Sequence, residues 1–287
     1  EDGPTIFISA AIHGDEINGV EVIRRLLSRK KLLSHLKGTL IAVPIVNMFG
    51  FNRNLRYLLY RRDLNRVFPG AKKGSLADQI AYKFMKEVVE KCDYGIDLHT
   101  GSAHRFNLPQ IRAYLDNPEI ESLARDFGVP VILHSNYRDG SLRQAAAEKN
   151  VKILLFEGGE ALRYDEKIIK SAEQGILSIL ASIGMLKKEL VKTKIPKTRE
   201  IFCARSSNWV SAPHSGSMHI RKHVGNKVKK GEILGVISDP FGIEKHFVGY
   251  RTEHITKEAN NARSITAAAM FSSNATLASN EIGRAHV

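Results

Sequence analysis

The sequence predicts an α/β protein with a mixed, mostly parallel sheet sandwiched by helices, followed by a small all-β, barrel-like domain. Strand-like and helix-like segments alternate from residue 4 to about residue 186, which is typical of a largely parallel sheet. Several strand-like segments are continuous apolar runs, as expected where both faces of a strand are buried. After about residue 200 the pattern changes to short β segments separated by glycine turns. We therefore predict domains at 1–190 and 197–250, with 251–287 left unassigned.

Each element of the first domain has a local signal. A β-branched and apolar run, TIFISAAI, predicts a strand at 5–12, and apolar residues at helical spacing predict a helix at 18–36. A second buried strand is expected at 38–47, then an amphipathic helix at 75–92 with Ser75 as its N-cap. Strands at 94–101 and 109–115 precede a helix at 117–128, which Gly128 ends. The remaining elements are a strand, a helix, a strand and a long helix, at 130–135, 141–150, 151–159 and 164–186.

The second domain follows a charged segment at 187–200, which Pro196 interrupts and which we interpret as a linker. Its segment VGNKVKKGEILGVISD, at 224–239, resembles half of a biotinyl/lipoyl-type barrel. No lysine stands between two methionines, as the modified lysine of a carrier does, so we expect a packing or lid module.

The composition describes a basic, cysteine-poor chain. Among its 287 residues 43% are hydrophobic, yet no apolar run reaches the ~18 residues of a membrane helix. Cys92 and Cys203 are far apart and outside any CxxC pair, which fits a reducing cytoplasm. The net charge of +13 comes from scattered Lys and Arg without a nucleic-acid-binding motif, which favours a solvated basic surface. We expect a cytoplasmic protein that binds neither nucleic acid nor membranes; a homo-oligomer is left open.

Side chains that can bind a metal follow two of the predicted strands. His13 and Glu16 lie three residues apart in HGDEING, directly after the strand at 5–12. Zinc prefers imidazole nitrogen and carboxylate oxygen, with three protein ligands and a water in catalytic sites. His-x-x-Glu alone is a weak signal, but His99 also leaves a strand, and functional residues gather at the carboxyl ends of parallel strands. The alternative is a structural histidine satisfied at a strand end.

Other residues of the same segment have expected roles of their own. Asp15 is expected to be exposed and Asn18 to brace the turn, while Gly14 and Gly19 give the turn its freedom. A competing metal site is offered by three later histidines, which we place on the surface of the second domain: His214, His219 and His223.

Two further features suggest a binding pocket with a base. The segment 46–70 is dense in Arg and Asn after a strand, which indicates an anion pocket, with a solvent-facing basic loop as the alternative. Glu157 ends an apolar strand, where desolvation raises the pKa of a carboxyl and suits a general base. The alternative is an acid paired with a nearby Arg. Glu160 is the rival carboxylate and is expected to be more exposed.

Four motifs in one order carry a resemblance to a known family. They are HGDEING (13–19), VN…GF…R…RDLNRVFPG (46–70), DLHTG (97–101) and FEGGE (156–160). Over roughly residues 5–250 the chain resembles the succinylglutamate desuccinylase/aspartoacylase family of zinc-dependent deacylases with a carboxypeptidase A-like fold. The resemblance implies that residues 1–190 form a zinc-hydrolase domain that hydrolyses the amide bond of a small, anionic N-acyl amino acid.

The resemblance also implies roles for individual residues. One zinc ion per chain is held by His13, Glu16 and His99, with water in the fourth position. Glu157 is the general base, and Arg56 polarises the carbonyl that is attacked. The substrate carboxylate is gripped by Asn65 and Arg66, and Asp63 orients the first zinc-binding histidine.

The chain departs from the family pattern in the Arg-rich segment. Met48 stands where a proline is usual, and residues 57–62 are more apolar than in relatives, which leaves the shape of the pocket rim open. A zinc carboxypeptidase that removes C-terminal residues from peptides remains an alternative, since the chemistry is the same. A ligand-binding relative without activity is a second alternative, although none of the expected ligands is missing.

Overall fold

The computed structural model describes residues 2–102, 104–191 and 201–249, together with short strands at 265–266, 271–272 and 284–286. The chain divides into two compact units. The first contains Glu1–Ser102 and Pro109–Ser206, and the second contains Ala103–Leu108 and Ser207–Val287. The first unit runs past residue 190 because β7 (Phe202–Ala204) pairs with β5 (Val131–His134) in the central sheet. Most of the expected linker and of the unassigned tail lies outside the described residues.

The central sheet of the first unit has the strand order β2-β1-β3-β6-β4-β5-β7. β1 runs parallel to its neighbours β2 and β3, and β3 runs parallel to β6. β5 runs parallel to β4 and β7, so the predicted, mostly parallel sheet is confirmed. The remaining strands of this path are β1 (Thr5–Ala10), β2 (Thr39–Val43), β3 (Tyr94–Gly101), β4 (Arg105–Ala113) and β6 (Lys152–Glu160).

The burial of each strand follows its place in the sheet. β1 lies between two neighbours, and its Ile6, Phe7 and Ile8 are fully buried, as the apolar run predicts. The prediction that residues 38–47 form a second buried strand is wrong in part. β2 spans five residues at the sheet edge and is only half-buried, because an edge strand is covered on fewer sides.

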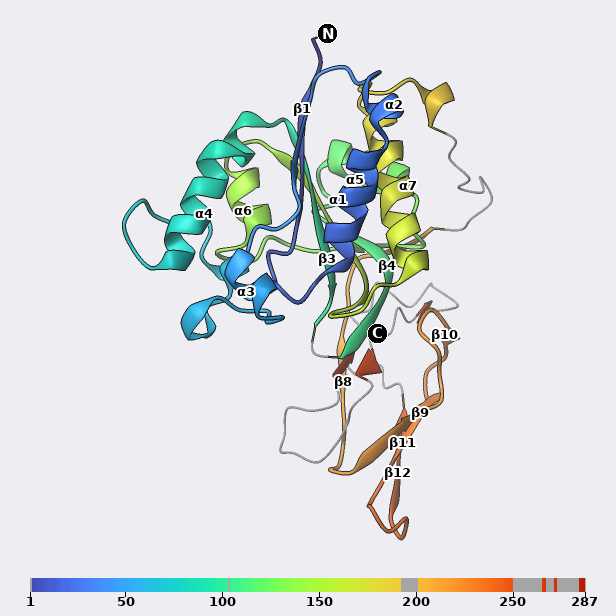
Figure 1. Cartoon of the computed structure of the whole chain (residues 1–287). Helices are drawn as coiled ribbons and strands as arrows, with labels where there is room; N and C mark the ends of the chain where they lie inside the picture. The colour runs from blue at the N-terminus through green and yellow to red at the C-terminus, as the bar shows by residue number, and fades with distance from the viewer. Residues whose placement is uncertain are drawn as a thin grey trace. The chain divides into compact units, whose positions relative to one another are not determined.

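Helices cover both faces of this sheet (Figure 1). α4 and α6 lie on one side and α1, α5 and α7 on the other. Their local signals are those expected: Ser75 and Asp78 form a capping box at α4, and Gly128 ends α5 in the left-handed conformation. The helices are α1 (Asn18–Ser28), α2 (Lys30–Leu33), α3 (Met48–Asn52), α4 (Leu76–Glu87), α5 (Pro118–Phe127), α6 (Leu142–Ala147) and α7 (Glu166–Ser182).

Short 3₁₀ turns complete the first unit: η1 (Leu59–Arg61), η2 (Leu64–Arg66), η3 (Val89–Lys91) and η4 (Lys188–Leu190). η1 and η2 lie in the Arg-rich segment between β2 and α4. That segment is anchored because Leu58, Leu64 and Phe68 are buried in one apolar cluster with Phe84 of α4 and Leu142 of α6. Packing of these three apolar side chains into the core beneath α4 and α6 therefore fixes the positions of the polar residues that lie between them in the sequence.

The described strands of the second unit are short and mainly antiparallel. β11 (Ile233–Ser238) pairs with β9 (Ser217–Ile220) and with β12 (Lys245–Gly249), as expected of a small all-β domain. His214, His219 and His223 are exposed, as predicted. The other short strands are β8 (Trp209–Ser211), β10 (Lys227–Val228), β13 (Ile265–Thr266), β14 (Phe271–Ser272) and β15 (Arg284–His286). Across the described residues, no helix is both long and apolar enough to cross a membrane.

Candidate active site

The turn after β1 carries the first two candidate ligands. Asn47 holds this turn in place: its side chain donates to the carbonyl of Ile12 at 3.2 Å and accepts from the amide of Gly50 at 2.8 Å. Gly14 packs so closely on α3 that a Cβ there would lie 2.0 Å from the Gly50 carbonyl carbon. The glycine is therefore required by close backbone approach, and the expected need for conformational freedom is wrong. The same holds for Gly19, whose added Cβ would lie 2.7 Å from side chains of β1 and β3.

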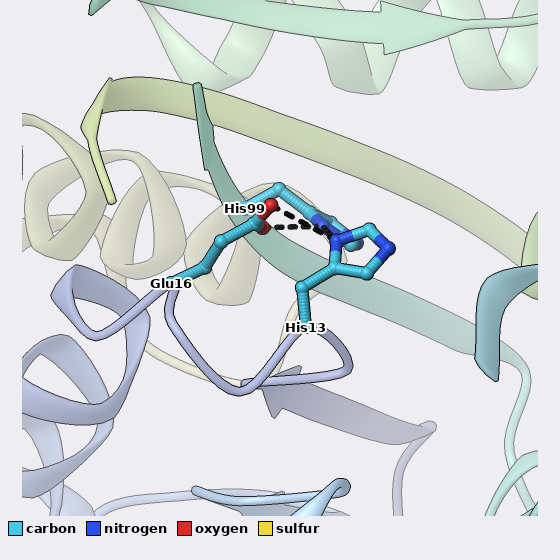
Figure 2. Close-up of side chains that lie close together, drawn as sticks. All are labelled: His13, Glu16 and His99. Atoms are coloured by element: carbon cyan, nitrogen blue, oxygen red, sulfur yellow. Dashed lines mark hydrogen bonds and ion pairs between the residues drawn. The ribbon is translucent and has the colours of Figure 1, made fainter. Parts of the chain in front are cut away.

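Three side chains converge at this turn (Figure 2). Nδ1 of His13 lies 2.9 Å from Oε1 of Glu16, and Nδ1 of His99, from β3, lies 2.8 Å from Oε2 of the same carboxylate. The two Nδ1 atoms are 3.2 Å apart. All three residues are buried, and each offers one ligand atom within 4.8 Å of the others. The cluster is placed to hold a metal ion, and its two imidazoles and one carboxylate are the donor set that zinc prefers.

The outer nitrogens of both rings are tied to carboxylates. Nε2 of His13 lies 3.1 Å from Oδ1 of Asp63, and Nε2 of His99 lies 2.7 Å from Oδ2 of Asp97. A carboxylate that accepts the Nε2 proton selects the tautomer in which Nδ1 has a free lone pair. Metal-binding histidines are commonly oriented in this way. The arrangement therefore aims both Nδ1 lone pairs at one point beside Glu16.

The charges of the cluster shift the pKa values of its members in opposite directions. Burial alone would raise the pKa of Glu16 and lower the pKa of His99. The two histidines outweigh burial at Glu16 and hold its pKa well below the usual value, while Asp97 and Glu16 raise the pKa of His99 well above it. Binding a cation must displace protons from such imidazoles, so the metal affinity should decrease as the pH is lowered.

Arg56 lies beside the cluster, from the loop between α3 and η1. Its Nη1 donates to Oε1 of Glu16 at 3.1 Å and its Nη2 to Oδ2 of Asp63 at 3.2 Å. Burial would raise the pKa of Asp63, but the hydrogen bond and charge of His13 and the charge of Arg56 bring it well below the usual value. Asp63 is therefore an anion at neutral pH that holds a candidate ligand and this guanidinium together.

Asn65 and Arg66 follow directly in η2. Asn65 is buried, and its Oδ1 accepts from the amide of Leu142 at the start of α6 at 2.9 Å. Its side-chain oxygen therefore holds the first residue of α6, a role that the sequence did not predict. Partial burial of the Arg66 guanidinium, together with the positive charge of Arg138, lowers its pKa. In the described part of the chain neither Arg66 nor Arg138 has a carboxylate within ion-pair distance.

Glu157 lies directly opposite His99 in the pairing of β3 with β6. Its Oε1 is 3.9 Å from Nε of Arg112, a loose ion pair of the kind that the alternative interpretation expects. The expectation that Glu160 is more exposed is wrong, because the two carboxylate side chains are 15% and 16% exposed. The pairing shifts by one residue after Glu157, so Glu160 pairs with Gly101 and simple alternation no longer separates the two acids.

Arg143 is a cationic neighbour of Glu157 that sequence reasoning missed. It lies on α6 with 6% exposure and donates from Nη2 to Oγ of Ser135 at 3.0 Å. Burial and the charge of Arg112 lower its pKa to about 10, so it stays cationic at neutral pH. The signal available was an Arg inside the short, alanine-rich helix LRQAAA.

Asp15 contradicts its expected exposure. The residue is 9% exposed, and its backbone carbonyl accepts from the amide of Leu162 at 2.8 Å. Burial and the charge of Glu16 raise the pKa of Asp15. Asn18 braces the same region, since its Oδ1 accepts from the amide of Asp165 at 3.0 Å. The loop between β6 and α7 is thereby fastened to the turn that carries His13.

Residues 2–183 match the model of the succinylglutamate desuccinylase/aspartoacylase catalytic domain. The chain belongs to this family. Two curated relatives come from Halomonas elongata and Prochlorococcus marinus. The first, N-alpha-acetyl-L-2,4-diaminobutyric acid deacetylase, is 27% identical over 88% of this chain and 75% of its own length. The second, a probable aspartoacylase, is 30% identical over 67% of this chain and 65% of its own length.

Solved structures of the family share the fold. A succinylglutamate desuccinylase/aspartoacylase from Rhodobacter sphaeroides superposes with a TM-score of 0.74 at 23% identity, covering 87% of this chain and 78% of its own. The product-bound ectoine utilization protein EutE (DoeB) from Ruegeria pomeroyi gives a TM-score of 0.73 at 22% identity, covering 87% and 77%. The predicted family and fold class are thus confirmed.

Proposed function

We propose that the chain is a zinc-dependent hydrolase that cleaves the amide bond of a small N-acyl amino acid. The observation that carries the proposal is the convergence of His13, Glu16 and His99, with the Nε2 atom of each imidazole tied to a carboxylate. Membership of the family and relatives named as a deacetylase and as aspartoacylases support the reaction class. The complete ligand set argues against a relative that only binds its ligand.

The three candidate ligands would hold one zinc ion per chain. Bound there, zinc supplies a Lewis acid and lowers the pKa of a coordinated water from 15.7 toward ~7. Asp63 and Asp97 keep the two imidazoles in the ligand tautomer. Because imidazole and carboxylate must be unprotonated to bind a cation, the residues favour occupancy at neutral and higher pH.

Glu157 would transfer the proton, and Arg56 would stabilise the negative charge that develops during the reaction. Glu157 accepts a proton from the attacking water and passes it to the leaving amine. Arg56 uses N–H groups not engaged by Glu16 or Asp63 to stabilise the negative charge that develops on the carbonyl oxygen. Loss of one such donor typically lowers the rate ~10²–10³-fold.

Asn65 and Arg66 would bind the substrate carboxylate. Oδ1 of Asn65 is engaged by Leu142, which leaves its Nδ2 group as the donor toward an anion. Arg66 offers the planar fork that suits bidentate carboxylate binding. Arg138 adds a second guanidinium beside Arg66, which favours anionic substrates further.

The experiment that tests this function is a screen of zinc-loaded protein against N-acyl amino acids and C-terminal peptides. We expect release of free amino acid from at least one N-acyl amino acid, and slower or no release from peptides. Release from peptides alone would establish the carboxypeptidase alternative. Full activity in protein that elemental analysis finds free of metal would refute the zinc dependence.

A further inference from the structure

A line of buried hydrogen bonds leads from β1 to the candidate metal ligands. Oγ of Ser9 donates to Oδ1 of Asp97 at 2.8 Å, and Oδ2 of Asp97 lies 2.7 Å from Nε2 of His99. The other nitrogen of that ring, Nδ1, lies 2.8 Å from Glu16. Ser9 and Asp97 are fully buried and His99 is 4% exposed. The hydroxyl is therefore connected to the metal cluster without solvent in between.

The sheet register creates this line. Ser9 of β1 and Asp97 of β3 are direct partners in the parallel pairing of the two strands. Asp97 and His99 are two residues apart on β3, so their side chains leave the same face of the sheet. A shift of either strand by one residue would turn the Ser9 side chain away from Asp97 and His99.

Ser9 and His99 are the hydrogen-bond partners of the Asp97 side chain among the described residues. The hydroxyl has a single proton, and the bond to Oδ1 leaves Oδ2 for the histidine. Asp63, the carboxylate behind His13, is held differently, because Arg56 and the backbone amide of Asn65 both donate to it. Apart from its bond to His99, the Asp97 side chain is thus held by one hydroxyl.

We propose that Ser9 is a positioning residue of the metal centre, which acts through Asp97 on the orientation and tautomer of His99. The proposal rests on the proposed metal site and extends it to a residue that lies outside all four family motifs quoted above. Removing the hydroxyl leaves a lone pair of a buried carboxylate without a donor and frees Asp97 to rotate. The Nδ1 lone pair of His99 is then aimed less accurately at the metal.

Zinc affinity measured by competition with a chromogenic chelator tests this role. We expect Ser9→Ala to weaken zinc binding ~10–100-fold, the usual range for residues behind a metal ligand. Ile8→Val is the matched control: it removes one methyl from a fully buried neighbour on the same strand, whose side chain leaves the opposite face. That control should bind zinc like the unmodified chain. Ser9→Thr keeps the hydroxyl and should restore most of the affinity.

A spectroscopic measurement separates positioning from general destabilisation. We expect the visible absorption spectrum of the cobalt(II)-loaded protein to change in Ser9→Ala and to stay unchanged in Ile8→Val. Folded Ser9→Ala with unchanged zinc affinity and an unchanged cobalt spectrum would overturn the proposal, as would equal losses in both variants. Neither the zinc affinity nor the cobalt spectrum requires a substrate. Both can therefore test the role of Ser9 even if the protein hydrolyses no N-acyl amino acid. Failure of the unmodified chain to bind zinc would overturn the proposed function itself.

Discussion

Replacement of Glu157 by glutamine isolates the proposed proton transfer from metal binding. The amide has nearly the same volume but cannot accept and return a proton in the way a carboxylate does. General acid–base catalysis typically contributes 10²–10⁴-fold. We therefore expect kcat to fall by about that factor, roughly 3–5 kcal/mol in activation free energy. The ion pair with Arg112 spans 3.9 Å and is partly exposed, so its loss should cost less than ~1 kcal/mol of stability.

Glu160→Gln is the matched control for this change. The two carboxylates lie on the same strand, three residues apart, and differ by only one percentage point in side-chain exposure. Because the register shift after Glu157 removes simple alternation, geometry alone does not disqualify Glu160 as the base. We expect Glu160→Gln to retain kcat within about threefold, since general-base effects are much larger.

Steady-state kinetics, zinc content and the melting temperature should be measured for both variants with a substrate that the unmodified chain cleaves. We expect Glu157→Gln to hold zinc and to melt near the unmodified temperature, with the loss confined to kcat. Near-normal turnover in Glu157→Gln would refute the assignment of the base. A large loss in Glu160→Gln alone would transfer the role to that residue.

Three further predictions concern metal, substrate and pH. His13→Ala should reduce the zinc content from about one per chain to near zero by elemental analysis; retention of zinc would remove this residue from the ligand set. Arg138→Gln should raise KM ~10–100-fold for N-acyl amino acids with two carboxylates and less for those with one, in line with a lost charge-assisted hydrogen bond. Arg24 and Arg25 lower the pKa of Glu21 to about 2, so this carboxylate stabilises the fold above its unfolded pKa and loses the effect as pH falls toward 2. Glu21→Gln should lower Tm by about 1–3 °C at pH 7 and by less near pH 2 in calorimetry, and an equal effect at both pH values would contradict the assignment.

Local signals in the sequence located most elements of the first unit. The strand expected at 94–101 is present with those bounds. α5 begins after Asn117 and ends at Gly128, since the Asn117 side chain caps the first turn and the glycine adopts a φ of 78°. The ends of β2 and its partial burial were not predicted, because the place of a strand at the sheet edge is a property of its neighbours.

The candidate site also combines features that the sequence predicted with features that only the structure revealed. By itself the sequence determined which residue types leave the strands: His13 and Glu16 after one strand, His99 and Glu157 at the ends of two others. Only the tertiary structure decided that Asp15 is buried, that Arg143 lies near Glu157, and that Ser9 supports Asp97. The physical reason is that an apolar pattern reports whether a segment is buried, whereas hydrogen-bond partners depend on strand order and register. Ser9 and Asp97 are 88 residues apart in the chain and become neighbours because β1 pairs with β3 in one register.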